Sequence, residues 1–220
     1  MSPRLSRRDF LRWSGALAVA VAAPPDVLGA STIQVISREA WGAEPPLRSL
    51  RPHEIRRITV HHSGVELASN RLAPARFRSH QRAHRARGWP DIAYHLLIDR
   101  HGNVYEGRPR WASGDTATAY DPRGHLLMLC EGHFGRQEPS EAQIGSLAAV
   151  LAWAVRRYGV PVSAIRGHRA YASTACPGAR LERRLDEVRR RVKAGGAGEL
   201  ALVRGAAARA RVRAIEAGRR

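Results

Sequence analysis

A histidine and a cysteine eight positions apart are the residues best suited to chemistry in this sequence. Between His168 and Cys176 stand mostly small and polar residues, and a Pro-Gly pair follows the cysteine. Imidazole nitrogen and thiolate sulfur are ligands that Zn²⁺ prefers in proteins. The spacing is too long for one face of a helix, so we expect a loop that folds back on itself. Because two ligands do not make a zinc site, a third must come from elsewhere in the chain.

The third ligand is expected at the end of an apolar, β-branched run over residues 55–62, which predicts a strand. The run ends in His61 and His62, and because side chains alternate along a strand, we expect only one of them to be a ligand. The pattern does not decide which one. Two histidines and one cysteine leave the fourth position of zinc open, which is its catalytic rather than its structural arrangement. The alternative for Cys176 is a small buried hydrophobic residue.

The rest of the chain alternates strand-like and helix-like segments, without an internal repeat. A stripe of apolar residues at helical spacing follows Ser140, which stands where an N-cap is expected. Residues 108–124 form a long Gly/Pro/Asp loop of the kind that lines sites. The expected strands are 33–36, 55–62, 92–98, 104–107 and 126–130, and the expected helices are 74–87, 141–158 and 181–192.

The N-terminal segment is predicted to be an export signal. Arg7 and Arg8 precede a short, weakly hydrophobic stretch at residues 13–23, a pattern that resembles a bacterial twin-arginine signal. The alternative is a basic amphipathic helix, but residues 15–23 have no polar face. We expect cleavage near Ala30 and therefore a signal over residues 1–30. The mature protein is then expected in the periplasm, the cell wall or the extracellular space.

The composition limits the class of protein. A chain of 220 residues fits one domain with extensions, and its net charge of +18 predicts attraction to polyanions. Residues 1–30 carry four Arg and two Asp, so their removal lowers the net charge only to +16. Two cysteines do not suffice for a disulfide-stapled fold, and a Cys130–Cys176 bridge would consume an expected ligand. The sequence contains no run of roughly 18 apolar residues, so it predicts no ordinary membrane span.

Four separated motifs follow one another along the chain: Ile58–Ser63, His84–His95, Asp99–Arg108, and Gly167-His168 with Cys176-Pro177-Gly178. In this order they resemble the peptidoglycan recognition protein and type 2 N-acetylmuramoyl-L-alanine amidase family. Residues 36–43 also resemble the first segment of that family. The resemblance covers about residues 33–185, which is most of the predicted mature chain.

The resemblance implies an α/β fold with a mixed central β-sheet flanked by helices and a zinc groove on one face. This fold agrees with the expected order of elements. The resemblance also implies that His61, His168 and Cys176 bind Zn²⁺ and that Tyr94 is the active-site phenol of catalytic members. Thr174 stands where some members carry lysine and others carry threonine.

The activity that the resemblance implies is zinc-dependent hydrolysis of the amide between N-acetylmuramic acid and L-alanine in peptidoglycan. Tyr94 and Thr174 would stabilise the developing negative charge. The family also contains modules that bind peptidoglycan or muropeptides without cutting them, and these commonly lack the cysteine. The cysteine and the tyrosine in this sequence favour catalysis, and a non-catalytic binding module is the alternative. For Tyr94 the alternative is a core tyrosine, and for Thr174 it is a loop residue that bonds its own backbone.

The sequence departs from the family in two segments. Residues 131–134 read Glu-Gly-His-Phe, where many members have Gly-Asp-Phe or Gly-Asn-Phe, so His133 is a surplus imidazole. It is interpreted either as a substrate contact or as a solvated loop residue. The loop at residues 108–121 matches no pattern of the family, and the sequence therefore makes no prediction of stem-peptide specificity.

A Gly-rich break at residues 195–198 separates the predicted amidase domain, residues 31–192, from an Ala/Arg-rich tail over residues 193–220. Such a tail is usually a solvated or helical extension. Two functional alternatives are retention on anionic wall polymers and contact with nucleic-acid phosphates. The export signal and the absence of a DNA-reading motif argue against nucleic acid as the partner.

Overall fold

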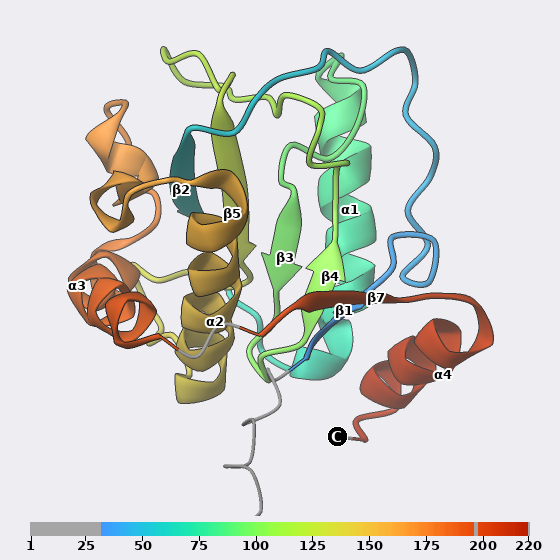
Figure 1. Ribbon diagram of the computed structural model, residues 1–220. Coiled ribbons are helices and arrows are strands. Elements are labelled where there is room, and N and C mark those ends of the chain that lie inside the picture. Colours follow the sequence, from blue (N-terminus) through green and yellow to red (C-terminus); the bar gives the residue numbers. More distant parts are fainter. Residues whose placement is uncertain (1–31, 196–197, 220) are drawn as a thin grey trace, which may run out of the picture.

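A seven-stranded sheet runs through the centre of the protein, with helices on both faces (Figure 1). This computed structural model describes residues 32–195 and 198–219, and the predicted signal at residues 1–30 lies outside them. The strands are β1 (Ile33–Ile36), β2 (Arg57–His62), β3 (Leu96–Ile98), β4 (Val104–Glu106), β5 (His125–Cys130), β6 (Ile165–Gly167) and β7 (Leu200–Val203). The helices are α1 (Ala73–Ala86), α2 (Glu141–Tyr158), α3 (Ala179–Ala194) and α4 (Gly205–Glu216), with short 3₁₀ turns η1 (Asn70–Leu72), η2 (Val162–Ala164) and η3 (His168–Ala170).

The sheet is mixed, as predicted. Its strand order is β6-β2-β5-β3-β4-β1-β7, and every neighbouring pair is parallel except the antiparallel hairpin of β3 and β4. The strand expected over residues 92–98 is shorter than predicted, since β3 begins only at Leu96, although the two residues before it still bond to β5 and to the segment after β4. The amide of His95 donates to the Leu127 carbonyl at 2.9 Å, and the carbonyl of Tyr94 accepts from the Arg108 amide at 2.8 Å.

Successive side chains of the central strands point to opposite faces of the sheet and belong to two separate hydrophobic cores. Leu96 and Ile98 of β3 point to the face that α2 and α3 cover, whereas Leu97 points to the face that α1 and α4 cover. Ser140 caps α2, since its Oγ accepts a hydrogen bond from the Gln143 amide at 3.1 Å, as the sequence pattern predicted. Both cysteines are free thiols. No helix among the described residues is long and apolar enough to cross a membrane.

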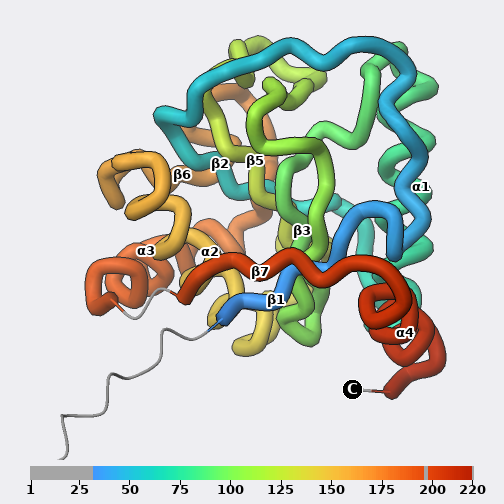
Figure 2. Tube along the Cα trace, turned by 45° about the vertical axis from the view of Figure 1, so that its right-hand side comes forward, coloured from blue at the N-terminus to red at the C-terminus, as the bar shows by residue number. Residues whose placement is uncertain are grey.

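The segment predicted to be a tail is instead part of the fold. Strand β7 pairs with β1 over four residues, and α4 then packs beside α1 (Figure 2). Helix α4 buries Ala208, Val212 and Ile215 against the core on that face. The packing of α4 was not predicted from its Ala/Arg composition, because only one narrow stripe of the helix is apolar. The arginines between those positions face solvent.

Truncating an apolar side chain of α4 should therefore destabilise the whole domain. Ile215 is 5% exposed, and Ile215→Ala is expected to lower the free energy of unfolding by about 2 kcal/mol, measured by urea denaturation. Arg209→Ala, on the exposed side of the same helix, is the control and should change it little. Equal stability of the two variants would mean that α4 does not pack on the domain in solution.

A buried histidine should make the fold sensitive to acid. His95 is fully buried, its Nε2 donates to the Ala112 carbonyl at 2.8 Å, and its Nδ1 accepts from the Leu127 amide at 2.8 Å. Burial lowers the pKa of His95 to about 3. Below pH about 6.5 the unfolded chain therefore takes up a proton that the native state refuses, so stability falls as the pH falls.

This residue alone should cost about 2 kcal/mol of stability at pH 5 relative to pH 7.5. His95→Gln retains a donor and an acceptor but does not titrate, so its loss of stability between these pH values should be smaller by that amount. Urea unfolding at both pH values measures the difference. An NMR titration in which His95 protonates near pH 6.5 in the folded protein would contradict the prediction.

Candidate metal centre

The register of two neighbouring strands brings two histidines together. Strands β2 and β6 are parallel, and Val60 pairs with Gly167. The next residue of each chain segment, His61 and His168, therefore lies at the same end of the sheet, with ring centroids 4.5 Å apart. Both side chains are buried.

Cys176 reaches the same place because its loop folds back, as predicted. The amide of Arg169 donates to the Cys176 carbonyl at 2.9 Å, which closes the segment between the histidine and the cysteine. The sulfur lies 3.6 Å from Nδ1 of His61, and the ligand atoms of His61, His168 and Cys176 all lie within 4.8 Å of one another. In tetrahedral zinc sites with bonds of about 2.0–2.3 Å, ligand atoms are roughly 3.5 Å apart, so this donor set fits Zn²⁺.

The two members of each adjacent pair that the sequence left open have different surroundings. His61 faces Cys176, whereas the ring of His62 turns away and its Nδ1 accepts a hydrogen bond from the Phe134 amide at 3.1 Å. Likewise Tyr94 lines the cavity, whereas His95 is buried in the core. The backbone amide of His62 still serves the site, because it donates to the Cys176 sulfur at 3.4 Å.

Without a cation the three side chains are uncharged at neutral pH. Burial, and after it the neighbouring His168, holds the pKa of His61 well below its usual value. Burial also raises the pKa of the Cys176 thiol to about 12, although the His62 amide opposes this effect. Nε2 of His61 is buried and has no hydrogen-bond partner among the residues that the structure describes. A metal that binds here must displace the thiol proton, after which the thiolate and the cation stabilise one another.

Tyr94 and Thr174 lie in the same cavity of about 270 Å³. The Tyr94 ring is 5.2 Å from the His61 ring, and burial followed by the nearby Cys176 raises the pKa of its phenol. The phenol is therefore a hydrogen-bond donor at neutral pH. Thr174 Oγ1 accepts from the Cys176 amide at 3.2 Å, which is the backbone bond of the alternative interpretation, yet its O–H remains free to donate into the cavity.

The loop at residues 108–121, which matches no family pattern, forms one wall of the cavity. It also contacts one of the candidate metal ligands. Thr118 Oγ1 lies 2.8 Å from His168 Nε2, so it is placed to accept the ring N–H and leave Nδ1 for a metal. The buried Arg108 anchors this loop through the Ser113 carbonyl at 2.6 Å and through Asp115 at 2.5 Å. No local pattern marks Thr118, since its role depends on a contact 50 residues away in sequence.

The unusual Glu131–Phe134 segment lies beside the site. Glu131 is fully buried and accepts hydrogen bonds from Ser63 Oγ at 3.0 Å and from His80 Nε2 at 2.9 Å. His133 is half-buried and packs edge-on against the His62 ring, with centroids 5.6 Å apart. Neither is among the residues that line the cavity. Glu131 and His133 therefore contact Ser63 and His62, which line the cavity, rather than the cavity itself.

The family of the chain follows from comparison with known proteins. A family model described as N-acetylmuramoyl-L-alanine amidase matches residues 51–179, which include all three candidate ligands and Tyr94. The chain belongs to this family. Its curated relatives carry two kinds of name. The N-acetylmuramoyl-L-alanine amidase of Sus scrofa is 33% identical over 147 residues, and peptidoglycan-recognition protein SC2 of Drosophila melanogaster is 30% identical over 154 residues.

The matched share differs between these family members. The match covers 63% of this chain but only 24% of the pig amidase, whereas it covers 68% of this chain and 83% of the fly recognition protein. This chain therefore spans about a quarter of the length of the pig relative. Membership of the amidase family does not by itself separate cleavage from binding, because both names occur among the relatives.

Solved structures of the family share the fold. The Drosophila peptidoglycan recognition protein SD superposes with a TM-score of 0.63 at 25% identity, over 70% of this chain and 93% of that one. The amidase LysC of Clostridium intestinale, at 22% identity and a TM-score of 0.59, shows the fold alone. A twin-arginine translocation signal matches residues 4–24, which supports export from the cytoplasm.

Removing the Thr118 hydroxyl should weaken metal binding without unfolding the protein. Thr118→Val keeps the side-chain shape but loses the contact that orients His168, and the affinity for Zn²⁺ is expected to fall about 10–100-fold. Competition with a chromophoric chelator measures the affinity. Thr118→Ser keeps the hydroxyl and should bind within a few-fold of wild type. Equal affinities of the valine variant and wild type would show that Thr118 does not orient the ligand.

Proposed function

We propose that this protein is a zinc-dependent amidase that cleaves the amide between N-acetylmuramic acid and L-alanine in bacterial peptidoglycan. The observation that carries the proposal is the meeting of His61, His168 and Cys176 within 4.8 Å in a cavity that also contains the Tyr94 phenol. Three protein ligands with a fourth position open are the catalytic arrangement of zinc. Membership of the amidase family supports the same activity.

The residues of the cavity have separate roles in the proposed hydrolysis. When bound to the three ligands, Zn²⁺ supplies Lewis-acid polarisation of a carbonyl and lowers the pKa of a water to about 7. Tyr94 donates its phenolic proton in a hydrogen bond to the oxygen that gains negative charge as the amide carbon becomes tetrahedral. Its raised pKa suits it to donate rather than to act as a base. Thr174 adds a second donor, and its bond to the Cys176 amide holds it in place.

The cavity walls are suited to a ligand that is part sugar and part peptide. Trp89 and His84 form one side, with ring centroids 4.8 Å apart, and the Asp115–Thr118 segment forms the other. Aromatic faces pack against sugar rings, while backbone and hydroxyl groups bond peptides. Peptidoglycan recognition protein LE, 27% identical with a TM-score of 0.63, was solved in complex with a monomeric diaminopimelic acid-type peptidoglycan. We therefore take muropeptides as the substrate class.

A non-catalytic recognition module is the second candidate. It is favoured by the relatives named peptidoglycan recognition proteins, and it would use the same cavity to hold the ligand intact. The thiol and the phenol are the features that favour cleavage. Either function requires the mature protein to reach peptidoglycan in the periplasm, the cell wall or the extracellular space, and the twin-arginine signal supports export from the cytoplasm.

Incubation of the mature protein with muropeptides should test the proposal. Mass spectrometry is expected to detect a split at the lactyl–alanine bond, and a chelator should abolish it until Zn²⁺ is restored. Tyr94→Phe should keep stoichiometric zinc but lose roughly 10²–10³-fold in kcat, because one oxyanion donor is removed. Cys176→Ala should lose the zinc itself.

One outcome would separate the two candidates, and two others would change the mechanism. Full zinc content with tight muropeptide binding and no cleavage would make the protein a recognition module. Undiminished turnover of Tyr94→Phe would remove the phenol from the mechanism but leave the amidase assignment intact. Cleavage that persists after complete removal of the metal would reject the zinc-dependent mechanism.

A further inference from the structure

A second set of hollows lies at the far end of α1 from the metal centre. His84, near the C-terminal end of α1, lines the metal cavity, whereas Arg71 precedes the helix and lines a hollow of about 450 Å³ beside the C-terminal end of α4. At 1.5 Å per residue, the two positions are about 20 Å apart along the helix axis. A neighbouring hollow of about 330 Å³ shares Arg100, His101, Ile215 and Arg219 with the first.

The hollows continue along α4 as a groove. A third hollow, of about 620 Å³ between the β1–β7 edge and α2, shares Asn103 and Arg211 with the second. We call this connected surface the α4 groove. The family match ends at residue 179, before α4 begins, and Arg211 and Arg219 come from the segment beyond the match. The groove therefore combines arginines of the C-terminal segment with Arg71 and Arg100 of the matched region.

The charges that line the α4 groove are all positive. Its lining contains Arg71, Arg100, Arg211 and Arg219 together with His101, and it contains no Asp or Glu. None of these four arginines forms an ion pair with a described carboxylate. Two carboxylates of nearby segments are already engaged: Glu216 by Arg78 at 2.8 Å and Glu138 by Arg180 at 3.1 Å.

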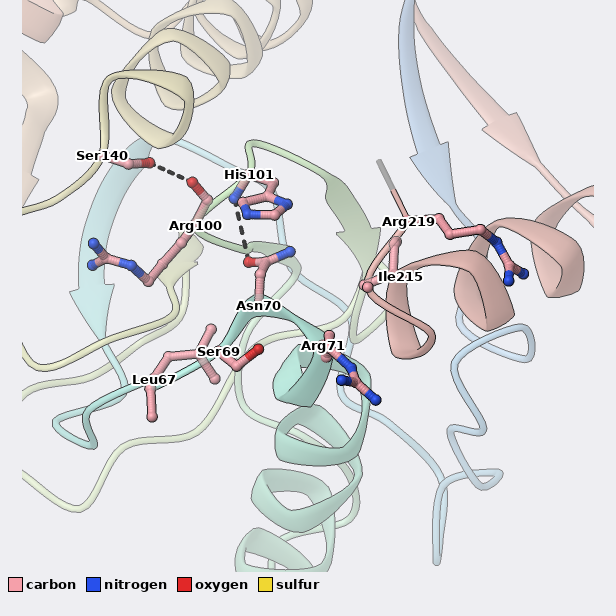
Figure 3. Close-up of a pocket in the computed structure, with 11 residues that line it drawn as sticks. Leu67, Ser69, Asn70, Arg71, Arg100, His101, Ser140, Ile215 and Arg219 are labelled. Carbon is pink, nitrogen blue, oxygen red and sulfur yellow. Dashed lines mark hydrogen bonds between the residues drawn. The ribbon is translucent and has the colours of Figure 1, made fainter.

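The floor of the groove is held rigidly. Asp99 is fully buried at the turn between β3 and β4, and it accepts hydrogen bonds from Tyr105, Asn103 and Asn70 at 2.7–3.0 Å. The His101 amide also donates to Asn70 at 3.3 Å, and the Arg100 carbonyl accepts from Ser140 at 2.5 Å (Figure 3). The acidic group of the turn thus points inward, and Arg100 and His101 of the same turn line the hollow.

We propose that the α4 groove binds a phosphodiester-linked anionic polymer of the bacterial envelope. Guanidinium groups match phosphate oxygens in charge and in fork geometry. The side chains of Arg71, Arg100 and Arg219 point away from one another around the hollow, which suits successive phosphates of a chain rather than one small anion (Figure 3). This site goes beyond the proposed amidase activity and does not depend on it.

Location and shape favour an envelope polymer over other polyanions. The export signal takes the protein away from cytoplasmic nucleic acid. The arginines line recessed hollows, where a polymer strand enters more readily than a flat membrane surface. The large hydrophobic side chains that are exposed include Leu72 beside Arg71, but none lines the groove, so a membrane anchor is not provided there.

Binding of the full mature chain to a polyglycerol-phosphate chain tests the proposal. The variant Arg71→Gln/Arg211→Gln/Arg219→Gln should bind at least about tenfold more weakly at physiological salt, and log Kd should depend less steeply on log salt. Contacts to four phosphates predict a slope of about 3, and removal of three of them predicts a slope of about 1. Zinc content and muropeptide cleavage should be the same as in wild type.

The matched control removes the same charge elsewhere. Arg57→Gln/Arg157→Gln/Arg190→Gln changes three exposed arginines of β2, α2 and α3 that also lack a described ion pair. It should weaken binding less than about threefold. Equal weakening by both variants would overturn the proposal, because net charge alone would then account for binding. Tighter binding to duplex DNA or to anionic vesicles than to the polymer, at equal phosphate concentration, would also overturn it.

Discussion

The parallel pairing of β2 with β6 is the constraint on which the site depends. Because Val60 is opposite Gly167, the residues that follow them must emerge side by side at one end of the sheet. The position opposite Val60 also requires glycine, because a Cβ at Gly167 would collide with Glu182 and would lie 2.8 Å from Pro177. The absence of a side chain lets the start of α3 and the Cys-Pro-Gly segment approach β6. The loop that carries Cys176 can then reach His61.

Burial determines the chemistry of the candidate centre. Each ligand loses water, so the metal-free state consists of two neutral imidazoles and a thiol rather than a cluster of charges. A divalent cation reverses that preference by stabilising the thiolate directly. The same burial keeps Tyr94 protonated, and the two effects lie within one small cavity. The cavity therefore combines three side chains that could hold a metal ion with one neutral hydrogen-bond donor.

Much of the fold was predictable because its signals are local. Short stretches of sequence predict these elements. The β-branched run before His61 predicts β2, and the Ser140 cap and the apolar stripe predict α2. The three candidate ligands were predictable from their residue types and motif context. Three features were not. The choice between His61 and His62 depends on sheet register, the role of Thr118 depends on a contact across the cavity, and the docking of α4 depends on a stripe of three residues within an Arg-rich helix.

The pairing of β1 with β7 has a consequence for biogenesis. Ile33, near the beginning of the described chain, is the partner of Leu200, which the ribosome adds much later. The edge of the sheet beyond β4 thus stays incomplete until the last strand has been synthesised. The twin-arginine route carries folded proteins, so export of the complete sheet by that route would require β7 to be paired first.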